Sequence, residues 1–356
     1  MNTINETPFA VATMLWEDLQ GRSNLTVIIK CTFTIQNDKV AASAAEQLPI
    51  FPADKSYTEN PASSARFESD MVPLKLSADV VLIGQAHAPH GRPVTQLDVS
   101  VRVGGLQKTI RVFGDRRWRF PTRLALVPLI SRPRPFVSME LVYERAFGGI
   151  DTAAARYCKE NLVGRGFIGK KTKASLHGRL LPNLEDPQRL IRSWKSRPKP
   201  VGFGFYDRGW MPRARYAGTY DERYRKERAP APPIDFSYAI YNGAHPDLQV
   251  EGYLRGDEEV ELMNVSPEAR LRFRLPGVRP KVTVAKWAVP PEEWIEQNED
   301  RAVSLDDVPT IEEAVPTVLD TLVFIPDERI FYEVFRGVCP LTDLETPEIA
   351  RVKIAM

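Results

Sequence analysis

The sequence predicts a mainly β protein, with two sandwich-like β lobes, a long irregular middle segment rich in Gly, Pro and Arg, and few short helices. Thirty of the 356 residues are proline, above the usual share of roughly 5%, and proline breaks helices and central strands. Runs in which apolar and polar residues alternate lie toward both ends of the chain, and such alternation is typical of strands. Between them, few apolar residues recur at any period.

The N-terminal lobe is expected over residues 1–145. Residues 24–35 (NLTVIIKCTFTI) are rich in β-branched side chains and nearly alternate, which predicts a strand. Residues 75–89 predict another. In 94–118, four apolar residues alternate with polar ones up to a Gly-Gly turn and a second alternating run, so this stretch predicts a hairpin. Residues 137–147 predict a further strand.

The middle segment is expected over residues 146–234, and the C-terminal lobe over 235–356. Packing of these segments as one compact unit is the open alternative to separate lobes. In the middle segment, the charged run 221–228 (DERYRKER) favours two helical turns that end at the prolines of APAPP. The acidic stretch 290–316 is interpreted as a solvated excursion. Six runs predict the strands of the C-terminal lobe: 248–254, 259–265, 269–277, 280–287, 320–327 and 330–337.

The cysteines and the N-terminus indicate a cytoplasmic protein. Three cysteines lie far apart in sequence and form no C-x-x-C pair, which suits a reducing compartment and predicts neither a disulfide framework nor a zinc site. The apolar patch near the N-terminus lacks the basic flank of a secretion signal. No stretch approaches the 18 or more apolar residues of a membrane span.

Charge is distributed unevenly along the chain. Residues 156–228 hold 19 Lys and Arg against 7 Asp and Glu, whereas residues 287–356 hold 5 against 16. The basic middle also carries many Trp, Tyr and Phe residues. Arginine beside aromatic rings can stack nucleic-acid bases, form the hot spots of a protein interface, or brace a loop internally. The pattern alone leaves these three alternatives open.

One stretch resembles a phosphate-binding loop. Residues 144–172 (ERAFGGIDTAAARYCKENLVGRGFIGKKT) contain G-x-x-x-x-G-K from Gly164 to Lys170, but Lys171 stands where the motif has Ser or Thr. No buried strand precedes the stretch and no apolar helical stripe follows it, although a phosphate site needs both. A structural loop is therefore favoured over a nucleotide site. No catalytic constellation, cofactor site or metal site is predicted.

Seven ordered stretches carry a family resemblance: 103–118, 143–151, 161–167, 181–187, 200–224, 233–249 and 320–337. The chain resembles the domain of unknown function 2169 family, which is found with bacterial type VI secretion clusters. The resemblance implies a cytoplasmic, non-catalytic adaptor or chaperone that binds a secreted effector, often one with a spike-tip (PAAR) domain, and aids its loading onto the VgrG spike.

With this resemblance, the glycines of the loop are expected to permit positive φ or close backbone approach. Arg145 and Arg165 are expected to hold the loop through bonds to Asp151 and Asp221. The expected partners are the effector and the VgrG spike, without nucleic acid or membrane. Two alternatives stay open: a nucleotide-dependent factor or enzyme that uses Gly164–Lys170, and a nucleic-acid binder that uses the basic middle segment. The candidates for partner binding or loop bracing are Arg145, Gly148, Gly149, Asp151, Gly164, Arg165, Gly166, Trp210, Arg213 and Asp221.

Overall fold

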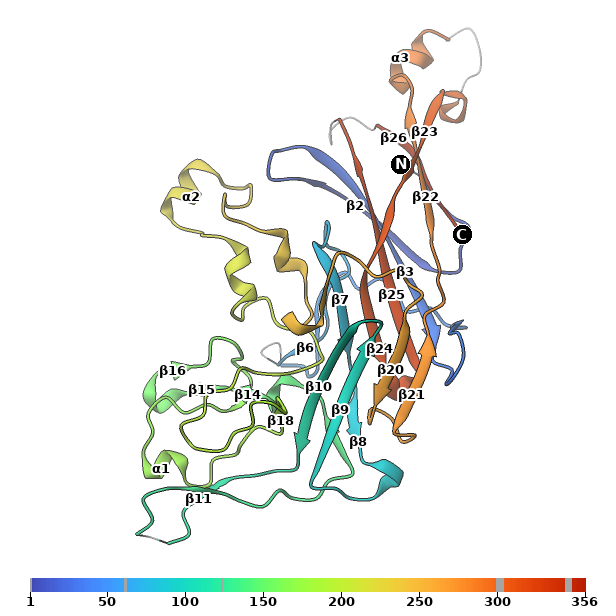
Figure 1. The fold of residues 1–356 in the computed structure, drawn as a ribbon. Helices are drawn as coiled ribbons and strands as arrows, with labels where there is room; N and C mark the ends of the chain where they lie inside the picture. Colours follow the sequence, from blue (N-terminus) through green and yellow to red (C-terminus); the bar gives the residue numbers. More distant parts are fainter. Residues whose placement is uncertain (1, 61–62, 123, 299–303, 343–347) are drawn as a thin grey trace.

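A seven-stranded sheet forms the centre of the molecule (Figure 1). The computed structural model describes residues 2–60, 63–122, 124–298, 304–342 and 348–356. In this sheet the strand order is β19-β7-β24-β25-β3-β2, with β4 beside β3, and β7 and β24 are parallel. The strands are β2 (Ala10–Glu17), β3 (Ser23–Thr34), β4 (Ala42–Ser43), β7 (Ser77–Leu82), β19 (Gln249–Glu251), β24 (Thr317–Ile325) and β25 (Ile330–Pro340).

Two further sheets flank the centre. The first has the order β18-β10-β9-β20-β21 and the second β1-β26-β22-β23. The strands of the first are β9 (Gln96–Val103), β10 (Leu106–Phe113), β18 (Leu184–Glu185), β20 (Glu259–Met263) and β21 (Arg270–Arg274). Those of the second are β1 (Asn2–Asn5), β22 (Lys281–Trp287), β23 (Thr310–Val315) and β26 (Ile349–Ala355).

The remaining elements are short. The described residues also form five two-stranded sheets: β5 (Lys55–Ser56) with β6 (Ala65–Phe67), β8 (Gln85–His87) with β13 (Ser138–Glu140), β11 (Trp118–Arg119) with β12 (Leu129–Ile130), β14 (Phe147–Gly148) with β17 (Arg165–Gly166), and β15 (Ile150–Asp151) with β16 (Arg156–Tyr157). The α-helices of the described residues are α1 (Lys173–Leu176), α2 (Glu222–Glu227) and α3 (Pro291–Glu296).

The predicted mainly β class with few short helices is confirmed, but the sheets are not divided at residues 145 and 235. β25 pairs with β3 from Ile330↔Thr34 to Pro340↔Asn24. β24 pairs with β7, and β20 pairs with β9. Strands from both ends of the chain therefore share the two largest sheets, and both ends are needed to complete either sheet.

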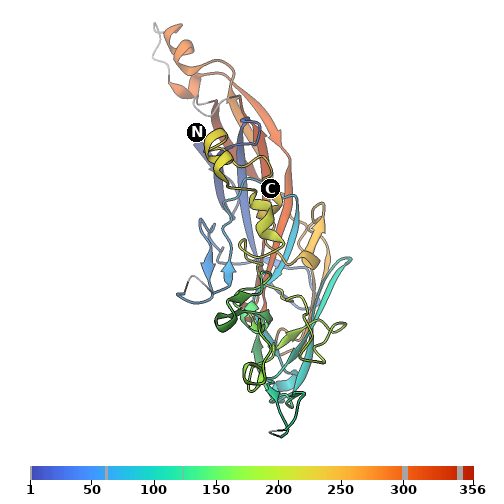
Figure 2. The same ribbon diagram turned by 90° about the vertical axis from the view of Figure 1, so that its left-hand side faces the viewer.

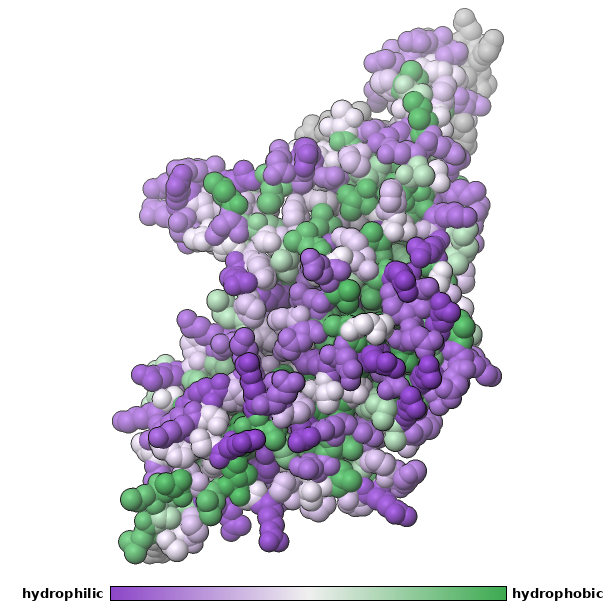
Figure 3. Space-filling model, in the orientation of Figure 1, coloured by the Kyte–Doolittle hydropathy of each residue, from purple (hydrophilic) through white to green (hydrophobic). Residues whose placement is uncertain are grey.

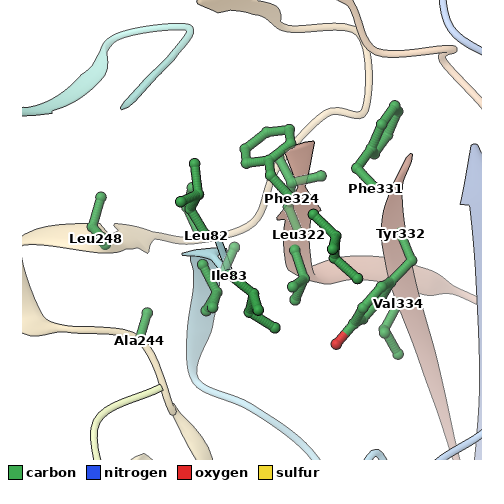
Figure 4. Close-up of a cluster of buried hydrophobic side chains, with 14 of the residues drawn as sticks. Leu82, Ile83, Ala244, Leu248, Leu322, Phe324, Phe331, Tyr332 and Val334 are labelled. Carbon is green, nitrogen blue, oxygen red and sulfur yellow. The ribbon is translucent and has the colours of Figure 1, made fainter. Parts of the chain in front are cut away.

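One continuous core fills the space between these sheets. β3, β24 and β25 are buried along nearly their whole length, as expected for central strands covered on both faces. The rings of Phe273 and Phe331, from different sheets, lie 5.4 Å apart. Figure 4 shows Leu82 between Leu248 and the side chains of β24 and β25, so segments distant in sequence meet in this core.

Several local predictions can be compared with the observed elements. The hairpin of β9 and β10 and the helix α2 are confirmed. The predicted strand 137–147 is shorter than expected, because the chain turns at Tyr143–Arg145 to bury the Tyr143 ring. Within 290–316, interpreted as a solvated excursion, Thr310–Val315 forms an edge strand whose mostly exposed side chains hide the strand pattern. Residues 299–303 of that stretch lie outside the described residues.

Candidate partner-binding surface

The glycine-rich loop is packed backbone against backbone. β14 and β17 pair in parallel, which places Gly148 beside Gly166. Gly149 has φ +110, and a Cβ atom there would lie 2.5 Å from the Gly164 carbonyl oxygen. A Cβ atom on Gly164 would lie 2.5 Å from Nδ2 of Asn161. Both positions therefore exclude a side chain, and the expectation of close backbone approach is confirmed at these two glycines.

The Asp151 carboxylate accepts hydrogen bonds from the backbone amides that a phosphate group would need. The donors are the backbone N–H of Gly169 at 2.9 Å and of Lys170 at 3.4 Å. These bonds, led by the one from Gly169, lower the pKa of Asp151 below its usual value. The helix that follows, α1, has only four residues. A bound carboxylate and a single helical turn support the structural-loop alternative.

The two arginines of the loop have other partners than expected. Arg165 donates from Nε to the Glu144 carbonyl at 2.9 Å and from a guanidinium nitrogen to Asn183 at 3.1 Å. Arg145 donates to Glu140 at 3.0 Å. The expectation that they meet Asp151 and Asp221 is wrong, because Asp151 turns back to the amides of its own loop. Asp221 caps α2 by accepting from the Tyr224 amide at 2.8 Å.

Trp210 and Arg213 are buried braces. Trp210 is 3% exposed, and its ring meets the edges of Tyr143 and Tyr206 at centroid distances of 5.2 and 5.4 Å. Arg213 is 4% exposed, and its Nη1 and Nη2 each donate a hydrogen bond to the buried carboxylate of Glu68. Its Nε donates to the Ile240 carbonyl at 2.7 Å. Neither side chain offers appreciable surface to a partner.

The loop packs on a small core of its own, which lies apart from the main core. We call it the second core; its buried residues are Trp118, Phe147, Cys158, Ile168, Leu176, Leu181 and Ile191. Trp118 belongs to the projection that we call the finger, residues 117–134. The Trp118 amide donates to the Arg179 carbonyl at 3.0 Å, and the Gly178 amide donates back to Trp118 at 2.9 Å. The base of the finger is thus fixed to the loop region.

The tip of the finger exposes a cluster of apolar side chains. Leu124 is 90% and Leu126 92% exposed, and Val127 and Leu129 are also exposed. Figure 3 shows this apolar cluster at the lower end of the molecule. Single exposed apolar residues are ordinary on a protein surface, whereas a contiguous group of them marks an interaction site or an aggregation liability. The tip is therefore the leading candidate for a partner contact.

The surroundings of the tip are strongly basic. Residues 116–139 include six arginines and no Asp or Glu. Arg117, Arg119, Arg132 and Arg134 are exposed there. The acidic stretch that contains α3 and β23 lies at the opposite end of the elongated molecule (Figures 1 and 2). The molecule thus has a basic, apolar end and an acidic end.

The finger was not predicted from the sequence, because residues 119–135 have neither a strand nor a helix period. One signal was present. The run LALVPL (124–129) is apolar without alternation, and it lies among prolines and arginines without a single carboxylate. Such a run has too little length for a buried helix, and nothing in its pattern directs it into a sheet. An exposed apolar tip on a basic support is consistent with that composition.

Comparison with known protein families gives a match over most of the chain. No helix among the described residues is both long and apolar enough to cross a membrane. Neither the curated proteins nor the solved structures include a significant match to this chain. A family described as an uncharacterized protein conserved in bacteria, DUF2169, matches residues 20–336. Since this match spans well over half of the chain, the protein belongs to the DUF2169 family.

Proposed function

We propose that this protein is a non-catalytic adaptor, or chaperone, that binds a type VI secretion effector in the bacterial cytoplasm and aids its loading onto the VgrG spike. The motifs that resemble the family, and the membership just described, support this proposal. The observation that carries it is the exposed apolar tip on a basic end. A side-chain cluster of this kind is suited to stoichiometric binding of another protein.

We place the partner contact at the finger because other candidate groups are buried or already hydrogen-bonded within the fold. Trp210 and Arg213 lie inside, and the Gly169 and Lys170 amides are bound by Asp151. By contrast, the finger combines leucine side chains with arginine, which is enriched at the centres of interfaces. A standard interface of roughly 1,200–2,000 Å² would cover the tip and part of the neighbouring basic surface.

Co-purification and secretion test the proposal together. The tagged chain, expressed in its own host, is expected to retain a single effector at a defined stoichiometry, and deletion of its gene is expected to abolish secretion of that effector. Secretion of the other effectors of the same cell is the control and should be unchanged. Wild-type secretion of every effector in the deletion strain would refute the adaptor function.

A further inference from the structure

We infer that the finger inserts its apolar tip into a groove on the effector that is apolar at its floor and lined with Asp and Glu at its rim. This inference rests on the proposed function and adds to it the docking element and the chemistry of the partner segment. Four features of the finger carry it: a fixed base, an apolar tip, a rim of arginines and an irregular backbone.

The base of the finger is held before any partner arrives. Trp118 is buried in the second core, and β11 pairs with β12 through Trp118↔Ile130 and Arg119↔Leu129. The Arg117 amide donates to the Ser131 hydroxyl at 2.9 Å, and the Ser131 amide donates back to the Arg117 carbonyl at 2.9 Å. A prepositioned support limits the ordering that binding requires to the tip itself.

The tip needs an apolar counterpart. Leu124 and Leu126 expose nearly their whole side chains to water, and Val127 extends the same surface. The Ala125 amide donates to the Thr122 carbonyl at 3.2 Å. Removing such leucines from water is favourable in proportion to the apolar area covered. A groove deep enough to take a turn of chain would cover all three side chains.

The exposed arginines on both arms of the finger, which form its rim, favour carboxylates on the partner. Arg117 and Arg119 lie on one side of the tip and Arg132 and Arg134 on the other, all exposed. Lys173, the first residue of α1, places its ammonium 5.0 Å from the Phe120 ring centroid, so further positive charge lies at the base. A partner segment rich in Lys or Arg would be repelled here, whereas Asp and Glu would be attracted and aligned.

The backbone of the tip favours a protein groove over a lipid bilayer. The residues between β11 and β12 form neither helix nor strand in their described part, and irregular backbone exposed to lipid leaves polar groups unsatisfied in the hydrocarbon. Membrane-contacting segments also present Trp or Tyr at the interface. The finger has two aromatic residues, Trp118 and Phe120, and both pack against the second core. A protein groove can supply hydrogen-bond partners that a bilayer lacks.

Matched variants test the tip and the rim separately. The probe is the purified effector identified by co-purification, and its dissociation constant is measured by calorimetry with the full chain. Leu124→Asp and Leu126→Asp should each weaken binding at least about tenfold. The control is Ile311→Asp, because Ile311 is 64% exposed on β23 at the opposite end. Arg119→Glu should weaken binding severalfold, more at low salt than at high salt, with exposed Lys281→Glu as control.

Cross-linking and vesicle binding distinguish an effector groove from a membrane as the partner of the tip. A photo-activated cross-linker placed at position 126 should label an effector segment with more Asp and Glu than Lys and Arg. Unchanged binding by both leucine variants, or a cross-linked segment that is basic, would overturn the inference and leave the adaptor function standing. Binding of wild-type chain to phosphatidylglycerol vesicles that Leu126→Asp abolishes, with effector binding intact, would assign the tip to membranes and overturn it as well. Failure of the wild-type chain to bind any effector would remove the proposed function and this inference together.

Discussion

The glycine-rich loop (residues 144–172) and the finger (117–134) pack on the same second core but place their side chains in opposite ways. The loop has the denser set of motif-like residues, and its Arg145, Arg165 and Asp151 side chains are hydrogen-bonded within the fold. The finger has no recognisable motif, and the leucine side chains at its tip face water. A segment dense in motif-like residues can therefore be structural support, while the surface available to a partner lies next to it.

The physical reason lies in what each kind of group requires when it is buried. A buried polar group without a hydrogen bond costs about 1–3 kcal/mol, so the loop can fold only if its carboxylates and amides find partners. An exposed leucine is about as hydrated in the folded chain as in the unfolded one, and it neither stabilises nor destabilises the fold. The loop is therefore constrained by folding, and the tip is free to be selected for binding.

The largest expected effect is on the brace between Arg213 and Glu68. Arg213→Ala should lower the free energy of unfolding by about 3–5 kcal/mol, because it leaves the buried Glu68 carboxylate without its main partner. Urea unfolding measures the loss. The control is Arg223→Ala, since Arg223 is 77% exposed and forms a surface pair with Glu227, for which less than about 1 kcal/mol is expected. Equal losses for the two variants would contradict the bracing role.

The next largest effect is expected at the close backbone contact between Gly149 and Gly164. Gly149→Ala should cost about 2–4 kcal/mol, because φ is +110 and the new Cβ would meet the Gly164 carbonyl. Gly204→Ala is the matched control, since a Cβ at Gly204 has no heavy atom within 4 Å. Denaturant unfolding of both variants is the measurement, and a Gly149 variant as stable as the control would show that the loop can relax.

A smaller, pH-dependent effect is expected at Asp151. Hydrogen bonds from the Gly169, Lys170 and Ala154 amides keep its pKa in the folded state below the usual value. A lowered pKa stabilises the folded chain at pH values above the unfolded pKa of about 3.9, and this stability is lost as pH falls through the folded pKa. Wild type should therefore be more stable than Asp151→Asn near neutral pH, and the difference should shrink below about pH 4.

Unfolding curves at a series of pH values from 7 to 3 measure this difference. Asp235→Asn is a useful comparison, because bonds from Thr219 also lower the pKa of Asp235 although it lies outside the loop. A difference between wild type and Asp151→Asn that grows on acidification would contradict the assignment of Asp151 as an ionised acceptor.

The strands were predictable from the sequence to the extent that their burial leaves an alternating or continuous apolar pattern. β3, β9, β10 and β25 have such a pattern. β23 does not, because an edge strand with exposed acidic side chains looks like a loop. The sharing of sheets between the two ends of the chain has no local signal, since strand partners are chosen by tertiary packing.

The candidate site was predictable only in part. Glycines that exclude a Cβ were recognisable in sequence, because few other residues serve there. The partners of the arginines were not, since Arg213 and Glu68 are 145 positions apart. A run of leucines can belong to the core or to the surface, and a sequence without an apolar period does not predict which of the two applies. The finger was missed for that reason.

At the exposed tip of the finger, substitutions should change the free energy of unfolding very little. Leu126→Ser should change the free energy of unfolding by no more than about 0.5 kcal/mol, because the side chain is 92% exposed. The same variant should be less prone to self-association at high concentration, since it removes part of an exposed apolar cluster. Urea unfolding and light scattering measure the two properties. A loss as large as that of Gly149→Ala would mean that the tip packs against the body of the protein.

The smallest effect is expected at Lys170, the residue that makes the loop resemble a phosphate site. Its side chain is exposed, and its amide and that of Gly169 already donate to Asp151. A phosphate group would have to displace this carboxylate from a loop that lacks the Ser or Thr of the motif. Lys170→Ala should therefore leave stability, effector binding and secretion at wild-type levels, and calorimetry should detect no heat on addition of Mg-ATP to either protein. Micromolar, magnesium-dependent binding of ATP that the variant loses would show instead that Asp151 can yield its amides to a nucleotide, and the loop would then be a site rather than a support.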